Sequence, residues 1–419
     1  MKRRKLKKKP IIMLAGIIIL FIFLIVVITS CSKEEEIKIE EKEITFISEF
    51  SNKSDVAIDD SVKKKIIDFM DLYYLSMKEL KEYNMMHLFS SSASKQAYLT
   101  QTAMNYLINY RLAQRNDLRL SDCDYNLEVQ KVVKEDNKLI ITVIESSRVN
   151  FSFMKDINSD SFGIVNTFTF LKENDNYELV AFNKNADFYN VFTANYEIQD
   201  DKEASEIKTD LLELNASVLE TVKDAVETEK ENLKNYKENK GLKTKSCDHT
   251  YDRELAYNYA MLWVDERNSE YAAFDTYGGN CQNYASQVLL SGGIPMDTTG
   301  SYKWKWYGSY VDETSSNKGR TPSWTGVGQF YTYAKYNNGA GLCATVDVNY
   351  FYAEKGDVMQ VGTNGEWAHT IVAAGKIEKD GQVLDVLTTS NTTDRKNYPL
   401  SAYNYSGKRL IKIYGWNEE

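Results

Sequence analysis

One cysteine and one histidine in the C-terminal part of the chain have the setting of a nucleophile and its base. Cys281 follows the turn sequence Gly-Gly-Asn at positions 278–280 and opens a stretch, 281–291, in which apolar residues recur at helical spacing. A thiol in the first turn of a helix lies near unpaired backbone N–H groups and the positive end of the helix dipole, and both favour the reactive thiolate. Farther along, His369 opens an apolar, strand-like run. The two side chains could therefore carry out acyl transfer.

The alternative is that Cys281 is an inert thiol in the protein core, which is common for cysteines in globular proteins. The chain holds only 3 histidines, and His369 alone lies in a strand-like context downstream of a cysteine that opens a helix. This scarcity favours the catalytic pair over the structural thiol.

A third, polar residue should orient the imidazole. The hairpin sequence at 378–381 predicts that the strand 382–387 runs antiparallel to the histidine strand and brings residues 388–394 close to it. Asn391 is the first candidate and Asp394 the alternative. Asp357 is interpreted as a turn residue at the start of a strand.

Trp304, Trp306 and Trp324 lie close together in a strongly aromatic segment. They are candidates to line a substrate groove, and a place in the core is an equal alternative.

Several motifs of cofactor and metal sites are absent from the sequence or incomplete in it. The chain has no glycine-rich phosphate loop, no HExxH helix and no serine nucleophile elbow, so we expect no cofactor and no catalytic metal. The acidic segment 156–163 lacks glycine at the sixth position of a calcium loop, and Thr167 stands at the twelfth, so a hairpin is predicted there. Cys247 and His249 lack a second ligand pair and are interpreted as linker residues.

The first 31 residues predict export and attachment to a membrane. Seven basic residues precede an uncharged apolar run from Pro10 to Ile28, and Ile-Thr-Ser-Cys at 28–31 resembles a bacterial lipobox with Cys31 as the lipidation site. An uncleaved membrane anchor is the alternative, because the run is close to the ~20 residues that span a bilayer. Both place the body on the extracytoplasmic face of the cell membrane.

The charge of the chain excludes a nucleic-acid partner. The formal net charge is −9, and removing the seven basic residues of positions 1–30, which hold no acidic residue, leaves −16. Cysteine is sparse, with 5 in the chain, so at most one disulfide is expected beside Cys31 and Cys281.

The pattern of elements predicts an α+β protein in several parts. A charged tether at 32–60 precedes two helices and four strands at 61–196, a pattern that resembles nuclear-transport-factor-like or cystatin-like folds. This part is interpreted as an interaction domain with a possible protein partner. A charged amphipathic helix and linker follow at 197–248, before the domain at 249–419 that holds Cys281 and His369.

Residues 250–419 resemble the putative amidase domain of exported proteins from spore-forming bacteria, a relative of the papain-like CHAP and NlpC-type cell-wall hydrolases. The residues that carry the resemblance are Tyr251, Asp252, Arg253, Ala256, Tyr259, Ala260, Asn268, Tyr271, the segment 278–283, Ser286, Gln287, the segment 292–296, Trp304, Trp306, Ser323, Trp324, the segment 356–360, His369 and the segment 391–394. The chain departs from the family at Asn280, where Asp is common, and at Asn391, where members often have His. Asn280 is expected to cap the helix as Asp would.

The resemblance implies a papain-like domain in which Cys281 attacks a carbonyl carbon and His369 moves the proton. It also implies a surface enzyme that cleaves an amide bond, with peptidoglycan or a peptide as substrate. A transamidase or acyltransferase would use the same residues. The rival function is a non-catalytic surface lipoprotein whose papain-like domain only binds wall peptides or a partner protein.

Overall fold

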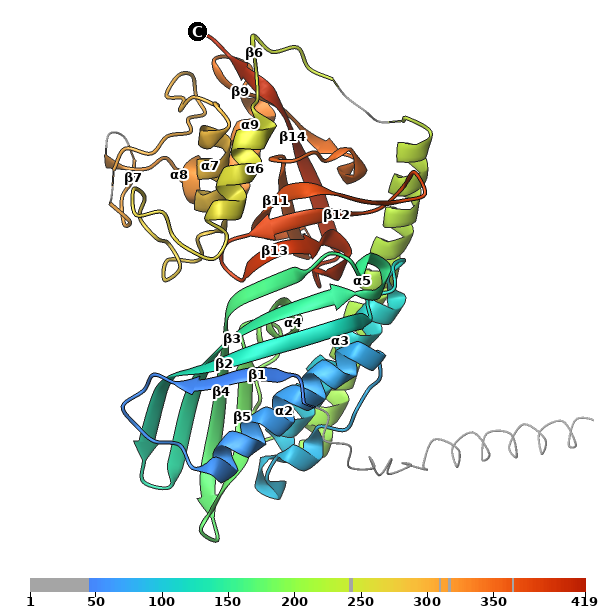
Figure 1. Cartoon of the computed structure of the whole chain (residues 1–419), viewed down its shortest axis with the longest axis vertical. Helices are drawn as coiled ribbons and strands as arrows, with labels where there is room; N and C mark the ends of the chain where they lie inside the picture. The colour runs from blue at the N-terminus through green and yellow to red at the C-terminus, as the bar shows by residue number, and fades with distance from the viewer. Residues whose placement is uncertain (1–44, 241–243, 309, 316–317, 364) are drawn as a thin grey trace, which may run out of the picture. The chain divides into compact units, whose positions relative to one another are not determined.

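The structure is a computed structural model that describes residues 45–240, 244–308, 310–315, 318–363 and 365–419 (Figure 1). Phe46–Glu419 forms one compact unit. The predicted signal or anchor segment with Cys31, and the tether up to residue 44, lie outside the described residues. No helix in the described ranges combines the length and the apolar character that crossing a bilayer requires.

The N-terminal part packs two helices on an antiparallel sheet. Buried and exposed residues alternate along its strands, which buries one face against the helices. Asn174 and Asp175, at φ 47° and 70°, form the tight turn between the last two strands. The elements are α2 (Asp60–Glu79), α3 (Ser94–Ala113), β2 (Leu120–Glu135), β3 (Lys138–Phe151), β4 (Ser159–Glu173) and β5 (Asn176–Lys184), with the single turns η1 (Met86–Leu88), η2 (Ser91–Ala93) and η3 (Ser152–Met154).

Part of the segment predicted as a tether belongs to this sheet. Ile47–Asn52 forms strand β1, which pairs in parallel with β2. The prediction of a free tether is therefore wrong for these residues, because the short strand carried no alternating pattern by which it could be recognised.

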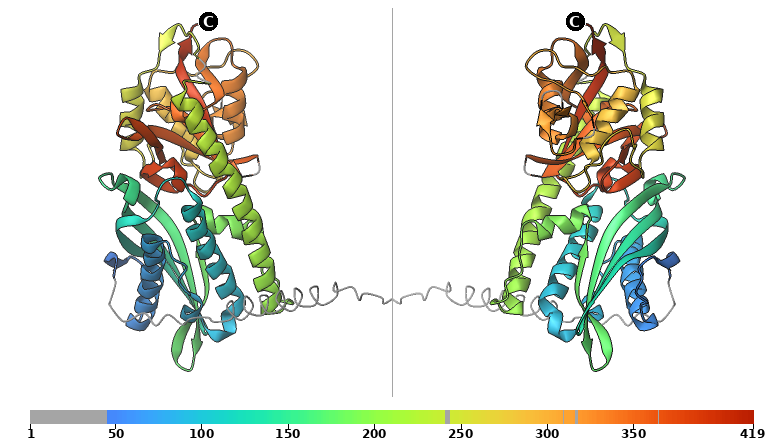
Figure 2. Two further views of the ribbon diagram at one scale, coloured as in Figure 1. Left: turned by 90° about the vertical axis from the view of Figure 1, so that its right-hand side faces the viewer. Right: turned by 90° about the vertical axis from the view of Figure 1, so that its left-hand side faces the viewer.

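A long amphipathic helix follows, as predicted. After α4 (Asp187–Thr193), helix α5 (Ala204–Lys237) begins with a capping box between Glu203 and Glu206. The helix runs beside α3 (Figure 2). It ends near the turn η4 (Tyr350–Tyr352), where the rings of Tyr236 and Tyr352 lie 4.9 Å apart.

The C-terminal part places four helices on one face of a second set of strands (Figure 1). The helices are α6 (Arg253–Leu262), α7 (Cys281–Ser291), α8 (Pro322–Thr325) and α9 (Val327–Tyr336). The strands are β6 (His249–Thr250), β9 (Gly341–Val348), β10 (Val358–Thr363), β11 (Glu366–Lys379), β12 (Gln382–Ser390), β13 (Asp394–Pro399) and β14 (Gly407–Asn417), and a two-stranded ribbon is formed by β7 (Thr314–Ser315) and β8 (Lys318–Gly319). The turn η5 (Leu400–Ala402) follows β13. The α+β class is confirmed, and the likeness of 61–196 to a particular fold stays a prediction.

A single sheet joins the two parts. Strand β13 pairs antiparallel with β4, with Arg395 opposite Ser161. The strand order is therefore β1-β2-β3-β4-β13-β12-β11-β10-β14-β6. One apolar core continues from the N-terminal helices to the face of β11 that carries Ile371, and a second core lies under α6, α7 and α9 against the face that carries Val372. The predicted domain boundaries thus separate segments that share a sheet.

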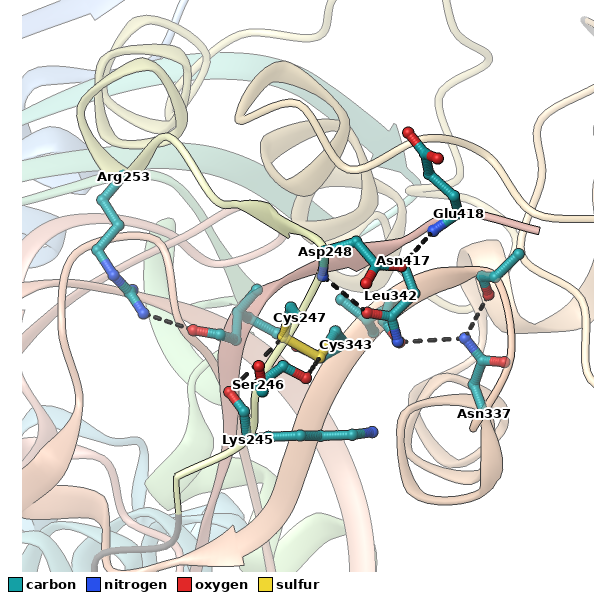
Figure 3. Close-up of a disulfide and its surroundings, with 12 residues drawn as sticks. Lys245, Ser246, Cys247, Asp248, Arg253, Asn337, Leu342, Cys343, Asn417 and Glu418 are labelled. Atoms are coloured by element: carbon teal, nitrogen blue, oxygen red, sulfur yellow. Dashed lines mark hydrogen bonds between the residues drawn. A yellow bond between two sulfur atoms is a disulfide. The ribbon is translucent and has the colours of Figure 1, made fainter.

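Cys247 and Cys343 form a disulfide (Figure 3). It joins the segment before β6 to β9, and nearby His249 bonds Glu418 through Nε2 at 2.7 Å and stacks on Trp416. The interpretation of Cys247 and His249 as plain linker residues is wrong, because their partners come from strands far along the chain.

Candidate functional site

Cys281 is the first residue of α7, as predicted. Gly278 and Gly279 have φ values of 94° and 112°, a backbone conformation that favours glycine, and they turn the chain into the helix. Asn280 does not cap the helix with its side chain. Its Oδ1 accepts instead from the backbone N–H of Phe274 at 3.1 Å, and its Nδ2 donates to Asn391. The prediction that Asn280 caps the helix is therefore wrong, because its side-chain amide forms hydrogen bonds with Phe274 and Asn391 instead.

The thiol of Cys281 is surrounded by backbone donors. Burial raises the pKa of the Cys281 thiol, and the residue is 6% exposed. The backbone N–H groups of Thr370, Gln282 and Cys281 itself act in the opposite direction with a smaller effect on the pKa. The expectation that the helix start favours the thiolate does not hold in this structure, because the effect of burial on the thiol pKa exceeds that of the backbone N–H groups.

His369 lies on β11 directly before Thr370. The Thr370 hydroxyl donates to Gln282 Oε1 of α7 at 2.9 Å, so the Thr370 side chain faces the helix. Since successive side chains of a strand point to opposite faces, the His369 ring leaves β11 on the other face, where its centroid lies 6.4 Å from that of Tyr403. No hydrogen bond joins the Cys281 thiol and the His369 ring, both of which the structure describes. The Thr370–Gln282 hydrogen bond holds the histidine strand next to the start of α7, but Cys281 and His369 are not paired.

The His369 ring has an unusual environment. The residue is 7% exposed, and its Nε2 is buried with no hydrogen-bond partner. Burial lowers the pKa of His369 to about 4; Asp187 raises it and Arg395 lowers it further. The imidazole is therefore neutral near pH 7. A buried nitrogen without a partner is rare in folded proteins and marks a place where another group can bind.

Asn391, the first candidate for the orienting residue, contacts other groups. Its Nδ2 donates to the carbonyl oxygens of Trp263, Val264 and Glu266 at 3.1, 3.3 and 3.1 Å. Its Oδ1 accepts from Asn280 Nδ2 at 2.7 Å. Asn391 thus fixes the segment between α6 and α7, and it does not orient His369 here.

Asp394, the alternative, forms a two-point ion pair with Arg267. The Arg267 nitrogens lie 3.0 and 3.1 Å from its two oxygens, and the Thr392 N–H donates to Oδ1 at 2.6 Å. Burial nevertheless raises the pKa of Asp394, outweighing the effect of Arg267. Both predicted orienting residues therefore hold loops rather than the imidazole.

Two of the three tryptophans, Trp304 and Trp324, lie in the protein core. Trp304 and Trp324 are 0% exposed and stack with centroids 4.9 Å apart, and their Nε1 atoms donate to Ser286 and Asn283 of α7. Trp306 is partly buried beside Phe274. The groove prediction is wrong for Trp304 and Trp324, because their rings fill the space between α7 and α8.

Residues 250–414 match the family model described as a putative amidase domain. This part of the chain is a putative amidase domain. The predicted family is confirmed, and the matched residues include Cys281, His369, Asn391 and Asp394. No curated protein and no solved structure matches the chain. The family supports a hydrolase.

The sequence alone does not indicate which charged groups act on the imidazole of His369. Arg395 Nη1 lies 2.7 Å from Asp187 Oδ2, and both side chains are buried. Asp187 is the first residue of α4, outside the amidase domain. No local pattern pairs residues so far apart, so the sequence held no signal for this contact. Within the described ranges, no cluster of His, Cys, Asp and Glu is placed to hold a metal ion.

Proposed function

We propose that the amidase domain hydrolyses an amide bond with Cys281 as nucleophile and His369 as base. The observation that carries the proposal is a buried imidazole whose Nε2 has no partner, next in sequence to Thr370, whose hydroxyl donates to Gln282, the residue after Cys281. A thiol that approached this nitrogen would give it the hydrogen-bond partner that it lacks. The family match supports hydrolase chemistry in this part of the chain.

The proposed reaction has two halves. His369 takes the thiol proton as Cys281 attacks the carbonyl carbon, and then gives it to the departing amine. Water resolves the thioester, and its proton passes through the same imidazole. The Cys281 N–H, together with the Thr370 N–H, is suited to hold the negative oxygen of the tetrahedral intermediate. A neutral His369 can accept the proton, but its ring leaves β11 on the face opposite α7, so the reaction requires a rearrangement that brings the ring and the sulfur together.

We propose a peptide amide of peptidoglycan as the substrate and the extracytoplasmic face of the membrane as the location. The basic and apolar N-terminal sequence supports export. The Cys247–Cys343 disulfide suits an oxidising compartment. An acyltransferase that passes the acyl group to an amine would use the same residues.

A second candidate is a non-catalytic binding protein. It is favoured by the raised pKa of the Cys281 thiol and by the engagement of Asn391 and Asp394 with groups other than His369. In that case the buried thiol is a core residue.

Alkylation of the full-length protein separates the two functions. Cys123 is the internal control, because it is also free and buried, with its pKa raised to about 11. If the proposal holds, iodoacetamide modifies Cys281 faster than Cys123 near neutral pH, and His369→Ala removes the difference. In parallel, His369→Ala and Cys281→Ser lower amine release from purified peptidoglycan by at least about a hundredfold.

The opposite result supports the binding protein. Modification of Cys281 no faster than that of Cys123, unchanged by His369→Ala, would contradict the catalytic pair. Fast, His369-dependent alkylation without release of amine from peptidoglycan would retain the pair and reject this substrate.

A further inference from the structure

A small cavity lies between the N-terminal sheet and the amidase domain, away from the Cys281 thiol. Its volume is about 60 Å³. The polar side chains that line it include Tyr73, Arg111, Glu145, Lys184 and Arg395. Four of these five residues belong to the N-terminal part, and Arg395 belongs to β13.

Three of the charged residues at the cavity have partners. Lys184 forms a buried ion pair with Glu145, whose oxygens also accept from the Tyr74 hydroxyl at 2.6 Å and Asn166 Nδ2 at 2.8 Å. Arg395 is paired with Asp187. These groups leave no net charge on the wall.

Arg111 differs from them. It is 5% exposed, its Nε is buried without a hydrogen-bond partner, and its Nη1 reaches the Leu118 carbonyl only at 3.4 Å. None of the carboxylates in the described segments forms an ion pair with it. A guanidinium keeps its charge in proteins, so this wall of the cavity carries a buried positive charge without a counterion. Such a charge is costly unless something pairs with it.

We propose that this cavity is a binding site for a small oxyanion, a carboxylate or phosphate group, with Arg111 as its main ligand. The planar fork of donors on a guanidinium matches two oxygens of such a group. One water needs about 10–15 Å³ of cavity measured in this way, so about 60 Å³ accommodates four to six atoms of that size, which suits acetate or phosphate.

The site would also couple the two parts of the chain. A ligand held by Arg111 of α3 would lie beside Arg395 of β13, the strand that pairs with β4. Binding would therefore stabilise the folded arrangement in which β13 pairs with β4 and Arg395 with Asp187.

The test titrates the full-length protein, dialysed free of oxyanions, with acetate, phosphate and chloride at equal ionic strength. We expect one-to-one binding of acetate or phosphate by calorimetry and a saturable rise of at least about 2 °C in the unfolding midpoint. Arg111→Met should weaken binding at least about tenfold and abolish the rise. Arg119→Met is the matched control, because Arg119 is exposed and paired with Asp117.

The separate titrations with acetate and phosphate show which oxyanion the cavity binds. A response to acetate alone identifies a carboxylate site, and a response to phosphate alone a phosphate site. An equal response to chloride, or no response in the wild-type protein, would overturn the proposal and leave Arg111 solvated by water. Arg111→Lys, which keeps the charge without the fork, provides a second comparison if Arg111→Met does not fold.

Discussion

Asn280 Nδ2 donates a hydrogen bond to Asn391 Oδ1 across 2.7 Å. The pair connects the residue before α7 to the residue after β12. A carboxylate and an imidazole can make the same contact with the polarity of donor and acceptor reversed. An Asp at position 280 with a His at position 391 could therefore keep the link between the start of α7 and the end of β12.

The first prediction concerns this pair. Asn280→Asp should destabilise the fold by about 1–3 kcal/mol, because two acceptor oxygens would face each other and the Asn391 amide cannot turn over without losing three carbonyl partners. Adding Asn391→His should recover part of this loss. Urea unfolding of both single variants and the double variant measures the coupling. Strictly additive effects would show that the two positions are independent.

The second prediction is a pH dependence of stability due to His369. In the folded protein the pKa of His369 is about 4, below the ordinary 6.5. The neutral, buried imidazole therefore makes its full contribution to stability above pH 6.5, and this contribution is lost as the pH falls from 6.5 to about 4. The full shift corresponds to on the order of 3 kcal/mol. Asp385, with a pKa raised to about 6, acts oppositely, because its contribution is lost as the pH rises through 6.

The variant His369→Gln isolates the histidine, since Asp385 is present in both proteins. Between about pH 5 and pH 7.5, the wild type should gain about 2 kcal/mol more than the variant in the free energy of unfolding. Equal gains in urea titrations would show that the imidazole is not buried in solution.

The third prediction concerns the disulfide. Cys247→Ser with Cys343→Ser should lower the free energy of unfolding by about 2–4 kcal/mol, because the bond closes a long loop with a sequence separation of 96. Dithiothreitol should lower the unfolding temperature of the wild type and leave that of the double variant unchanged. A wild type insensitive to the reductant, with its thiols free by mass spectrometry, would mean that the bond is not formed.

The fourth prediction tests the charges around His369. Asp187→Asn should lower the pKa of His369, and Arg395→Met should raise it, because the two groups act on the imidazole with opposite sign. NMR titration of ring-labelled histidine measures both shifts. The other histidines, His87 and His249, serve as internal references because both are more exposed. Shifts of the same sign in both variants would contradict the arrangement.

Many helices and strands of this protein can be predicted from its sequence, because their formation depends on residues that are close together in the chain. The glycines before Cys281 and the apolar period after it placed the start of α7 correctly. Alternation and turn residues likewise located β2 to β5 and the hairpin of β11 and β12. The family of residues 250–414 also follows from motifs along the chain.

Contacts between distant segments could be decided only by the tertiary structure. Nothing local indicates that β13 pairs with β4, that Cys247 bonds Cys343, or that Asp187 reaches Arg395. The same holds for the direction of the His369 side chain. A strand pattern predicts that neighbouring side chains point to opposite faces of the sheet, but only the packing of α7 on the face that carries Thr370 determines which face the imidazole occupies. The sequence therefore determined the chemical groups and their local elements, and the packing of distant segments decided which of these groups meet.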